Sequence, residues 1–329
     1  MSNPLFVIPA LSFSVTLVVL HLMLKSGFAR IVMDHPNDRS LHSAPIPRTG
    51  GLGLMAGIVA GFVPVLERAL WPILLLGGAL FAVSLLDDKV GLPVLLRIAA
   101  HFLAAAGMMW AYFPHDALWW AMMATLAVVW MTNLYNFMDG ANGLAGGMGL
   151  FGFGFYAAAA WLSGDAVFAS ISLSVAAAAG AFLVFNFHPA RIFMGDAGSV
   201  PLGFWAAALG ILGWQRELWP GWFPVLVFSP FIVDATVILL KRMGRKQKIW
   251  LAHRQHYYQR LIRMGWSHRK LALSEYALMS VAGISGVLGL SLTEKLQYAM
   301  LAGWMAAYLM LMLAIDTRWA VFLRRSNPC

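Results

Sequence analysis

Polar residues of this chain gather in short stretches between long apolar runs, and the stretch 186–199 has residue types suited to chemistry. Its Asp196 is flanked by small residues, so a large, hard ligand can approach the carboxylate closely. Ser199 and Pro201 are typical of the cap and first turn of a helix, whose N-terminal end carries partial positive charge. A carboxylate beside such an end suits Mg²⁺ and a phosphate group. A tight interhelical turn with a capping aspartate would use the same residues.

Asp87 and Asp88 form an adjacent pair where another apolar run ends. Two carboxylates at the edge of a membrane must be solvated, paired or bound to a metal. Like charges push pKa values apart, so one aspartate could hold Mg²⁺ while the other takes a proton. A solvated helix end with Lys89 as partner is the alternative.

Amides dominate the stretch 133–143, where three asparagines and Asp139 stand among glycines. This set predicts a hydrogen-bonding surface for a base or a sugar, because a simple turn does not need so many amides. Arg97 and His101 lie four residues apart and therefore share one helix face. We expect them either to hold a phosphate or to pair with the neighbouring aspartates.

His253 and His256 stand in the most basic loop of the chain, 241–269. The two histidines could ligate a metal, but the loop has no cysteine or glutamate to complete a zinc set. We therefore interpret them as a clamp for a diphosphate, with an amphipathic helix on anionic lipid as the alternative. Asp234, inside an apolar run, is either a functional acid or a structural partner of Lys241 or of a backbone group.

Composition indicates that membrane helices position these residues. The chain has 329 residues, of which 60% are hydrophobic and only 11% are charged. A soluble protein of this size carries about 25% charged residues, so the composition predicts a polytopic membrane protein. The single cysteine, Cys329, excludes a disulfide framework. The net charge of +9 does not indicate a nucleic-acid partner, because the basic residues follow the membrane topology.

Apolar runs of about 16–22 residues predict eleven membrane-spanning helices. The predicted spans are 4–24, 50–66, 71–86, 93–112, 117–135, 145–162, 166–185, 199–214, 221–240, 270–290 and 296–315. We expect an all-α fold in which residues 1–329 form one integral-membrane catalytic domain, with no soluble domain and no internal repeat.

Lysine and arginine set the expected orientation of the bundle, since they collect on the cytoplasmic side of bacterial membrane proteins. All of them except Arg68, Arg216 and Lys295 fall within or beside stretches that share one side, namely 25–49, 87–92, 136–144, 186–198, 241–269 and 316–329. The N-terminus is therefore expected outside and the C-terminus in the cytoplasm. The aspartates and histidines described above fall on the same side, which predicts an active site that faces the cytoplasm.

These motifs together resemble the polyprenyl-phosphate N-acetylhexosamine-1-phosphate transferases, a superfamily that also contains the phospho-MurNAc-pentapeptide transferase of peptidoglycan synthesis. The similarity runs from Asp34 to about Arg260. The stretches that carry it, in the order of the family, are 34–42 with 45–51, the pair Asp87–Asp88, 133–143, 193–199, and His253 with His256. The His-Arg-x-His-x-Tyr-Gln pattern is most similar to the branch that starts O-antigen or capsule repeat units.

The resemblance implies a cytoplasm-facing Mg²⁺ site, which Mn²⁺ could also occupy, with Asp196 and Asp88 as metal ligands. It implies that Phe193 stacks on uracil and that Asn186 lies close to the nucleotide or the metal. Many relatives have an acid where Asn142 stands and a third acid after the aspartate pair, where this chain has Lys89. The expected catalytic residues are Asp87, Asp88, Asp139, His253 and His256. The expected substrate-binding residues are Asn136, Asn142, Asn186, Phe193, Arg48, Arg97, His42 and Arg254.

The resemblance further implies an enzyme of the bacterial cytoplasmic membrane that moves a sugar-1-phosphate from a UDP-amino sugar to undecaprenyl phosphate and releases UMP. Asp87 is the candidate for deprotonating or orienting the lipid phosphate. The MurNAc-pentapeptide branch is one alternative. A secondary transporter of an anionic solute is another, although transporters place polar residues near the bilayer midplane, often in repeated halves. The expected partners are the nucleotide sugar, the lipid phosphate and membrane lipid, with no nucleic acid, and a homodimer is left open.

Overall fold

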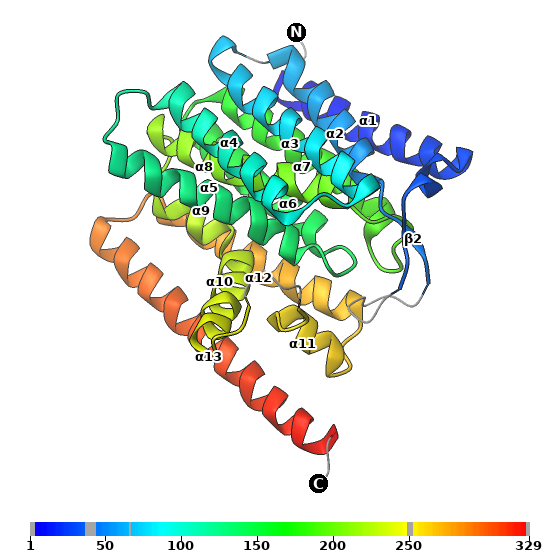
Figure 1. Cartoon of the computed structure of the whole chain (residues 1–329). Coiled ribbons are helices and arrows are strands. Elements are labelled where there is room, and N and C mark those ends of the chain that lie inside the picture. Colours follow the sequence, from blue (N-terminus) through cyan, green and yellow to red (C-terminus); the bar gives the residue numbers. More distant parts are fainter. Residues whose placement is uncertain (1–3, 37–43, 66, 249–252, 327–329) are drawn as a thin grey trace.

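The computed structural model describes residues 4–36, 44–65, 67–248 and 253–326, and these residues are mostly helical (Figure 1). The long helices are α1 (Pro4–Ser26), α3 (Trp71–Val90), α4 (Val94–Tyr112), α5 (Leu118–Met138), α6 (Leu144–Leu162), α7 (Ala166–Asn186), α8 (Asp196–Gln215), α12 (His268–Gly289) and α13 (Glu294–Ser326). The shorter ones are α2 (Gly50–Phe62), α9 (Trp222–Val227), α10 (Ser229–Gly244) and α11 (Tyr257–Arg263). Single 3₁₀ turns are η1 (Phe28–Ile31), η2 (Val63–Val65) and η3 (Arg68–Leu70).

The predicted all-α membrane architecture is confirmed, because each of the eleven predicted segments is helical. Eight helices among the described residues are long and apolar enough to cross a membrane, and α2 is a shorter apolar helix. The number of eleven spans stays a prediction. The ninth segment, 221–240, differs from the prediction because it breaks at Phe228 into α9 and α10. Pro230 lies in the first turn of α10, where its missing N–H and its ring prevent α9 from continuing.

Helix α8 lies at the centre of the bundle and is the most buried of the candidate spans. It packs against α2, α3 and α5. Between lipid-embedded helices the hydrophobic effect adds little, so close van der Waals packing of small residues holds the helices together. A Cβ atom added to Gly51 of α2 would lie 2.5 Å from the backbone nitrogen of Gly198 in α8, so the two backbones touch.

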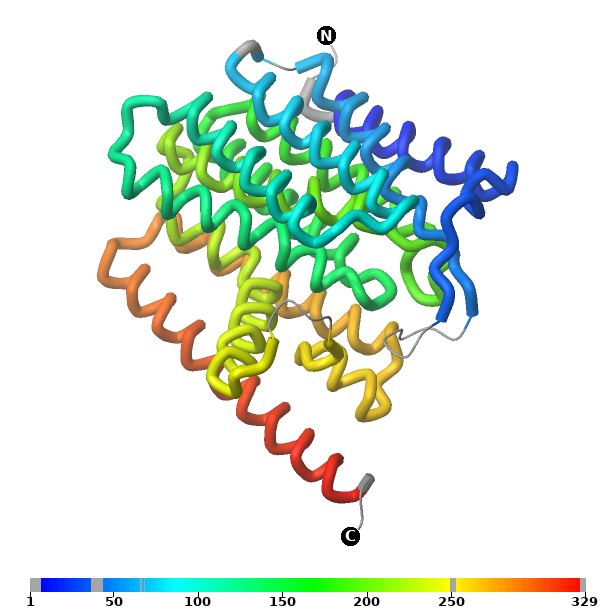
Figure 2. Tube along the Cα trace, in the orientation of Figure 1, coloured from blue at the N-terminus to red at the C-terminus, as the bar shows by residue number. Residues whose placement is uncertain are grey.

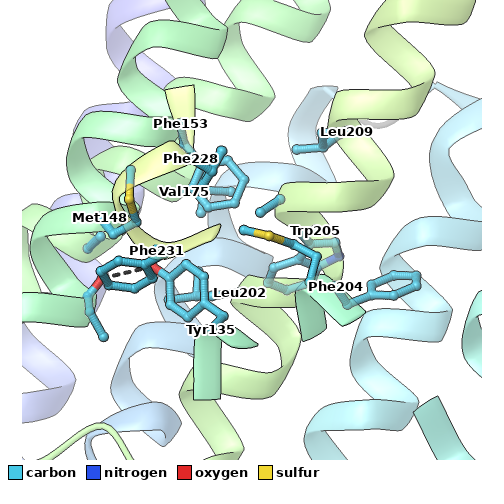
Figure 3. Packing of buried hydrophobic residues seen from close by; sticks show 14 of the residues in the cluster. Tyr135, Met148, Phe153, Val175, Leu202, Phe204, Trp205, Leu209, Phe228 and Phe231 are labelled. Atoms are coloured by element: carbon cyan, nitrogen blue, oxygen red, sulfur yellow. Dashed lines mark hydrogen bonds between the residues drawn. The ribbon is translucent and has the colours of Figure 1, made fainter. Parts of the chain in front are cut away.

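Aromatic rings fill the interior between α5, α6 and α10 (Figure 3). The rings of Tyr135 and Phe231 meet edge to face with their centroids 5.3 Å apart, and those of Phe153 and Phe228 do so at 5.7 Å. Tyr135 is completely buried, and its hydroxyl donates to the carbonyl of Ala145 over 2.8 Å. This arrangement satisfies the polar atom of a buried tyrosine and holds the end of α5 against the start of α6.

A short antiparallel pair, β1 (Met33–Asp34) and β2 (Ile46–Pro47), joins α1 to α2. The chain before α8 adds to this pair, because the N–H of Phe193 donates to the carbonyl of Pro47 over 2.7 Å. The N–H of Gly50 then donates to the carbonyl of Phe193 over 2.9 Å. These bonds place Arg48 next to the start of α8.

The last helix, α13, lies along the outside of the bundle, and its C-terminal end extends beyond the other helices (Figure 2). Most of its apolar residues are exposed. Among the described residues it packs against α11 and α12 and forms hydrogen bonds with α10.

Candidate active site

A cavity of about 530 Å³ opens where the polar ends of several helices meet. The cavity is lined by the end of α3, the start of α4, the end of α5, the start of α8, α10 and the His253–His256 segment. Its polar lining residues are Arg48, Ser84, Asp87, Asp88, Arg97, His101, Asn133, Asn136, Asp196, His253, His256 and Gln259. Its apolar lining residues include Val83, Val94, Ile98, Trp130, Phe137, Val200, Ala235 and Leu239.

Asp88 caps helix α8 from another part of the chain. Its carboxylate accepts the backbone N–H of Asp196 over 3.2 Å and that of Ala197 over 3.0 Å. Helix α8 therefore begins at Asp196, three residues before the position predicted from Ser199. The predicted cap at Ser199 is wrong, because Ser199 lies inside the helix and its hydroxyl can donate to the carbonyl of Gly195. Gly195 adopts φ of 72°, a left-handed conformation that favours glycine.

Asp87 faces a different set of groups although it is the next residue in sequence. One of its oxygens accepts the N–H of Leu92 over 2.6 Å, and the other accepts from Nη1 of Arg97 over 3.0 Å. Successive helical residues point about 100° apart, which explains why the two aspartates serve different partners. Asp87 therefore closes the turn between α3 and α4 and orients Arg97.

Arg48 bridges two carboxylates in the cavity. Its Nη2 atom lies 2.7 Å from Asp88 and 3.1 Å from Asp196, and Nη1 of Arg97 lies 3.5 Å from the other oxygen of Asp196. With Asp87 included, three carboxylates face two guanidinium groups, so one formal negative charge is left. The cluster is thus a place where a cation and an anionic ligand can be held together.

The donor set fits Mg²⁺, which prefers hard carboxylate and amide oxygens. The position between Asp88 and Asp196 already holds the positive nitrogen of Arg48. The amide oxygen of Asn136 lies next to the same helix start, where the hydroxyl of Ser199 donates to it over 3.0 Å. Within the described part of the chain no group of three His, Cys, Asp or Glu side chains forms a ready-made metal cage. A magnesium ion would therefore be shared between few protein ligands and the substrate phosphates.

His253 and His256 both line the cavity, with their rings stacked at 4.8 Å. The Nδ1 atom of His256 lies 3.1 Å from Asp234, whose carboxylate also accepts the backbone N–H groups of Tyr257 and Tyr258 at 2.9 and 3.1 Å. Asp234 therefore caps α11 and orients His256, which leaves Nε2 of that ring for a ligand. Sequence alone had left the partner of Asp234 open between Lys241 and the backbone.

Burial lowers the pKa of His253 to about 4, with contributions from the nearby His256 and Arg242. His253 is therefore neutral near pH 7 and can accept one hydrogen bond and donate another.

Asp139, just after the end of α5, is half-buried and does not line the cavity. Burial, followed by the charge of Asp196, raises the pKa of Asp139 to about 7.

Asn142, Asn186 and Phe193 do not line the cavity. The side chain of Asn186 is buried, accepts from the N–H of Gly143 over 2.9 Å and donates to the carbonyl of Ile192 over 2.9 Å. It therefore joins two motif loops instead of facing the cavity. Asn142 contacts Nδ1 of His188 at 3.1 Å.

Two other expected binding residues lie outside this cluster. Arg254 is half-buried beside the histidines but outside the cavity lining, and His42 lies outside the described residues. The structure brings together Arg48, Asp87, Asp88, Arg97, Asn136, Asp196, His253 and His256.

The sequence analysis gave no functional role to several of the lining residues. Trp130 and Gln259 contribute to the cavity, and Trp130 donates from its indole nitrogen to Thr236 over 3.0 Å. A tryptophan in an apolar run carries no signal of function, since such residues are frequent in membrane helices. Gln259 follows the His253–His256 motif by three residues, a spacing that places it on the first turn of α11.

Comparison with known proteins places the chain in a family. Residues 70–214 match the model of Glycosyl transferase family 4. The chain is 31% identical over 291 residues to a "Probable undecaprenyl-phosphate N-acetylglucosaminyl 1-phosphate transferase" of Bacillus subtilis, covering 83% of this chain and 80% of that protein. It is 26% identical to the "Undecaprenyl-phosphate alpha-N-acetylglucosaminyl 1-phosphate transferase" of Yersinia pestis, covering 99% of this chain and 94% of that protein. A phospho-N-acetylmuramoyl-pentapeptide-transferase of Shouchella clausii is 30% identical over 180 residues, 53% of each chain.

The bundle of apolar membrane helices and the relatives named as sugar-phosphate transferases together indicate an integral-membrane transferase. The similarity to the Bacillus subtilis protein extends over most of both chains. The chain belongs to glycosyl transferase family 4, within the superfamily of polyprenyl-phosphate N-acetylhexosamine-1-phosphate transferases.

Proposed function

We propose that this protein transfers an N-acetylhexosamine-1-phosphate from a UDP-sugar to undecaprenyl phosphate on the cytoplasmic side of the bacterial inner membrane. The observation that supports it most is the cluster of Arg48, Asp88, Asp196, Arg97 and Asp87 in one cavity at the polar ends of the helices. The product would start a lipid-linked glycan such as O-antigen or capsule. Relatives named for N-acetylglucosamine match most of the chain, whereas those named for the pentapeptide match about half, which favours a sugar without a peptide.

In this reaction an oxygen of the lipid phosphate forms a bond to the phosphorus that carries the sugar. The bond from that phosphorus to the UMP oxygen breaks, and UMP leaves with the electron pair. The second pKa of a phosphate monoester is about 6, so the lipid phosphate is mostly ionised near neutral pH and needs no strong base. The protein therefore acts chiefly by positioning and by stabilising charge.

Asp196 and Asp88 would hold the Mg²⁺ ion, which would offset negative charge on the diphosphate and on the leaving phosphate. Asp88 also holds the N–H groups at the start of α8, so it couples the metal site to the position of Asp196. Arg48, which bridges both carboxylates, would turn toward a substrate phosphate.

Asp87 is better suited to orienting Arg97 than to taking a proton, because both of its oxygens already accept hydrogen bonds. Arg97 lines the cavity together with the apolar residues Val94 and Ile98 of the same helix, and it would bind the lipid phosphate there. His253 and His256, which also line the cavity, would bind the donor diphosphate.

The test is UMP release by the purified full-length protein in lipid nanodiscs that contain undecaprenyl phosphate. UDP-N-acetylglucosamine, other UDP-N-acetylhexosamines and UDP-MurNAc-pentapeptide are supplied in turn with Mg²⁺. We expect release with a UDP-N-acetylhexosamine, only when the lipid phosphate is present, and none with the Asp196→Asn variant. Release with the pentapeptide donor alone would contradict the sugar assignment. Uptake of a nucleotide sugar into vesicles without UMP release would instead indicate a transporter.

A further inference from the structure

We propose that Asp316 of α13 is a positioning residue for the histidine pair and acts through Arg260 and Tyr257 of α11. This inference rests on the proposed function, because it assigns His256 a place in donor binding. Asp316 lies beyond the stretch of the chain that carries the family motifs, and the predicted last span ends one residue before it.

Asp316 joins three residues from two other helices at the surface of the bundle. Its Oδ1 accepts from Nη1 of Arg260 over 2.6 Å. Its Oδ2 accepts from Nζ of Lys241 in α10 and from the hydroxyl of Tyr257 over 3.2 Å. Charge-assisted hydrogen bonds of this kind are stronger than neutral ones, and the side chain of Arg260 is only 7% exposed.

Lys241 and Arg260 both lie against the ring of Tyr257, so their positive charges are close together and need the carboxylate of Asp316 as a counter-charge. Nζ of Lys241 lies 5.1 Å from the ring centre of Tyr257, and the guanidinium carbon of Arg260 lies 5.0 Å from the same centre. Without the carboxylate, their mutual repulsion would act between α10 and α11. Asp316 thus supplies the negative charge that lets α11 stay against α10.

The position of α11 decides where the histidines point. Tyr257 directly follows His256, and Gln259, one turn into the helix, lines the cavity together with His256. Asp234 holds the N-terminal end of α11, and the hydroxyl of Tyr258 donates to the carbonyl of Phe137 in α5 over 3.2 Å. Asp316 holds the outer side of the same seven-residue helix. A helix this short has little stability of its own, so these side-chain contacts set its position.

The first experiment compares Asp316→Asn with Tyr308→Phe. The control, Tyr308→Phe, removes the 2.6 Å hydrogen bond between Tyr308 of α13 and Ser229 of α10. It therefore weakens a contact between α13 and α10 that does not involve α11. We expect Asp316→Asn to lower kcat/KM about 10- to 100-fold, mainly through the donor KM, since a displacement of about 1 Å can have that effect. Asp316→Glu, which keeps the charge, should recover most of the loss, and Tyr308→Phe should keep wild-type kinetics. Equal kinetic losses in Asp316→Asn and Tyr308→Phe would overturn the proposal.

The second experiment is a double-mutant cycle with His256→Gln. If Asp316 acts through the histidine, Asp316→Asn should lower the activity little further in the His256→Gln background. If the two residues act independently, the fold-losses of the single variants should multiply in the double variant. Full activity of His256→Gln would mean that the proposed role of the histidine in donor binding fails. A large loss in His256→Gln that multiplies with that of Asp316→Asn would mean that only the positioning role fails.

Hydrogen–deuterium exchange gives a readout that does not depend on any substrate. The backbone amides of 257–263 should exchange faster in Asp316→Asn than in the wild type, and should be unchanged in Tyr308→Phe. Unchanged exchange of these amides in Asp316→Asn would also overturn the inference, whatever the activity.

Discussion

The carboxylate of Asp88, at the end of α3, accepts the backbone N–H of Asp196, the first residue of α8, over 3.2 Å. Arg48 contacts the carboxylates of both residues through one nitrogen atom. The two acids are 108 positions apart in the sequence, yet they form one unit in which α8, its cap and its counter-charge are positioned together. A change at either acid should therefore alter both the proposed metal site and the start of α8.

The Asp87→Asn and Asp88→Asn variants should lose activity in different ways. Asp88→Asn loses the negative charge that pairs with Arg48 and places an amide at the start of α8. The variant should therefore require more Mg²⁺, and added Mg²⁺ should partly restore its activity. Asp87→Asn loses its charged pairing with Arg97, so kcat should fall while the Mg²⁺ requirement stays the same. Steady-state rates at increasing Mg²⁺ concentrations measure both. Identical defects with equal rescue would mean that the pair acts as one metal-binding unit.

Asp196→Asn should abolish transfer while the protein still inserts and folds. The Asp196 side chain is partly accessible to the cavity, and its polar partners among the described residues include Arg48, Arg97 and Asn136. We expect kcat to fall by at least about 10²-fold, the size of effect that a lost electrostatic group at the reacting phosphate produces. Excess EDTA should have the same effect on the wild type. Near-normal turnover of the variant, at a wild-type melting temperature, would refute the assignment.

Gly51→Ala should be destabilising and Gly78→Ala should not. The new Cβ at position 51 would lie 2.5 Å from the backbone nitrogen of Gly198 and 2.8 Å from the carbonyl carbon of Ala197, so α2 and α8 would have to separate. Overpacking of this kind costs about 1–3 kcal/mol. A methyl group added to Gly78, on the exposed side of α3, would have no atom within 4 Å. Thermal unfolding in detergent checks both variants, and equal melting temperatures would contradict this packing.

The stability of the protein should depend on His253 in mildly acidic solution. Burial lowers its pKa from 6.5 to about 4, so the unfolded chain binds more protons than the folded protein between these values. Its contribution to stability is therefore fully present above pH 6.5 and is lost as the pH falls toward 4. We expect the melting temperature to fall more for the wild type than for His253→Gln between about pH 7.5 and about pH 5. Parallel pH profiles for the two proteins would contradict this prediction.

Residue types alone were enough to predict the class of fold and the region of the site. Lipid cannot hydrogen-bond to the backbone, so long apolar runs must form helices, and all eleven predicted segments do. Alternate crossings place Asp87, Asp196 and His256 at the same end of the bundle, and the structure brings them to one cavity. The order of the motifs was sufficient to identify the family.

The tertiary structure alone decided which atoms meet. Hydropathy does not specify how each helix is rotated about its axis or how closely two helices pack. It therefore cannot predict that Asp88 caps α8, or that the side chain of Asn186 forms hydrogen bonds with two backbone groups. Asp316 carries no motif at all, and its role follows only from the contacts that Arg260 and Lys241 make with it. Such contacts join residues far apart in the chain, and their geometry is set by the packing of whole helices rather than by any local stretch of sequence.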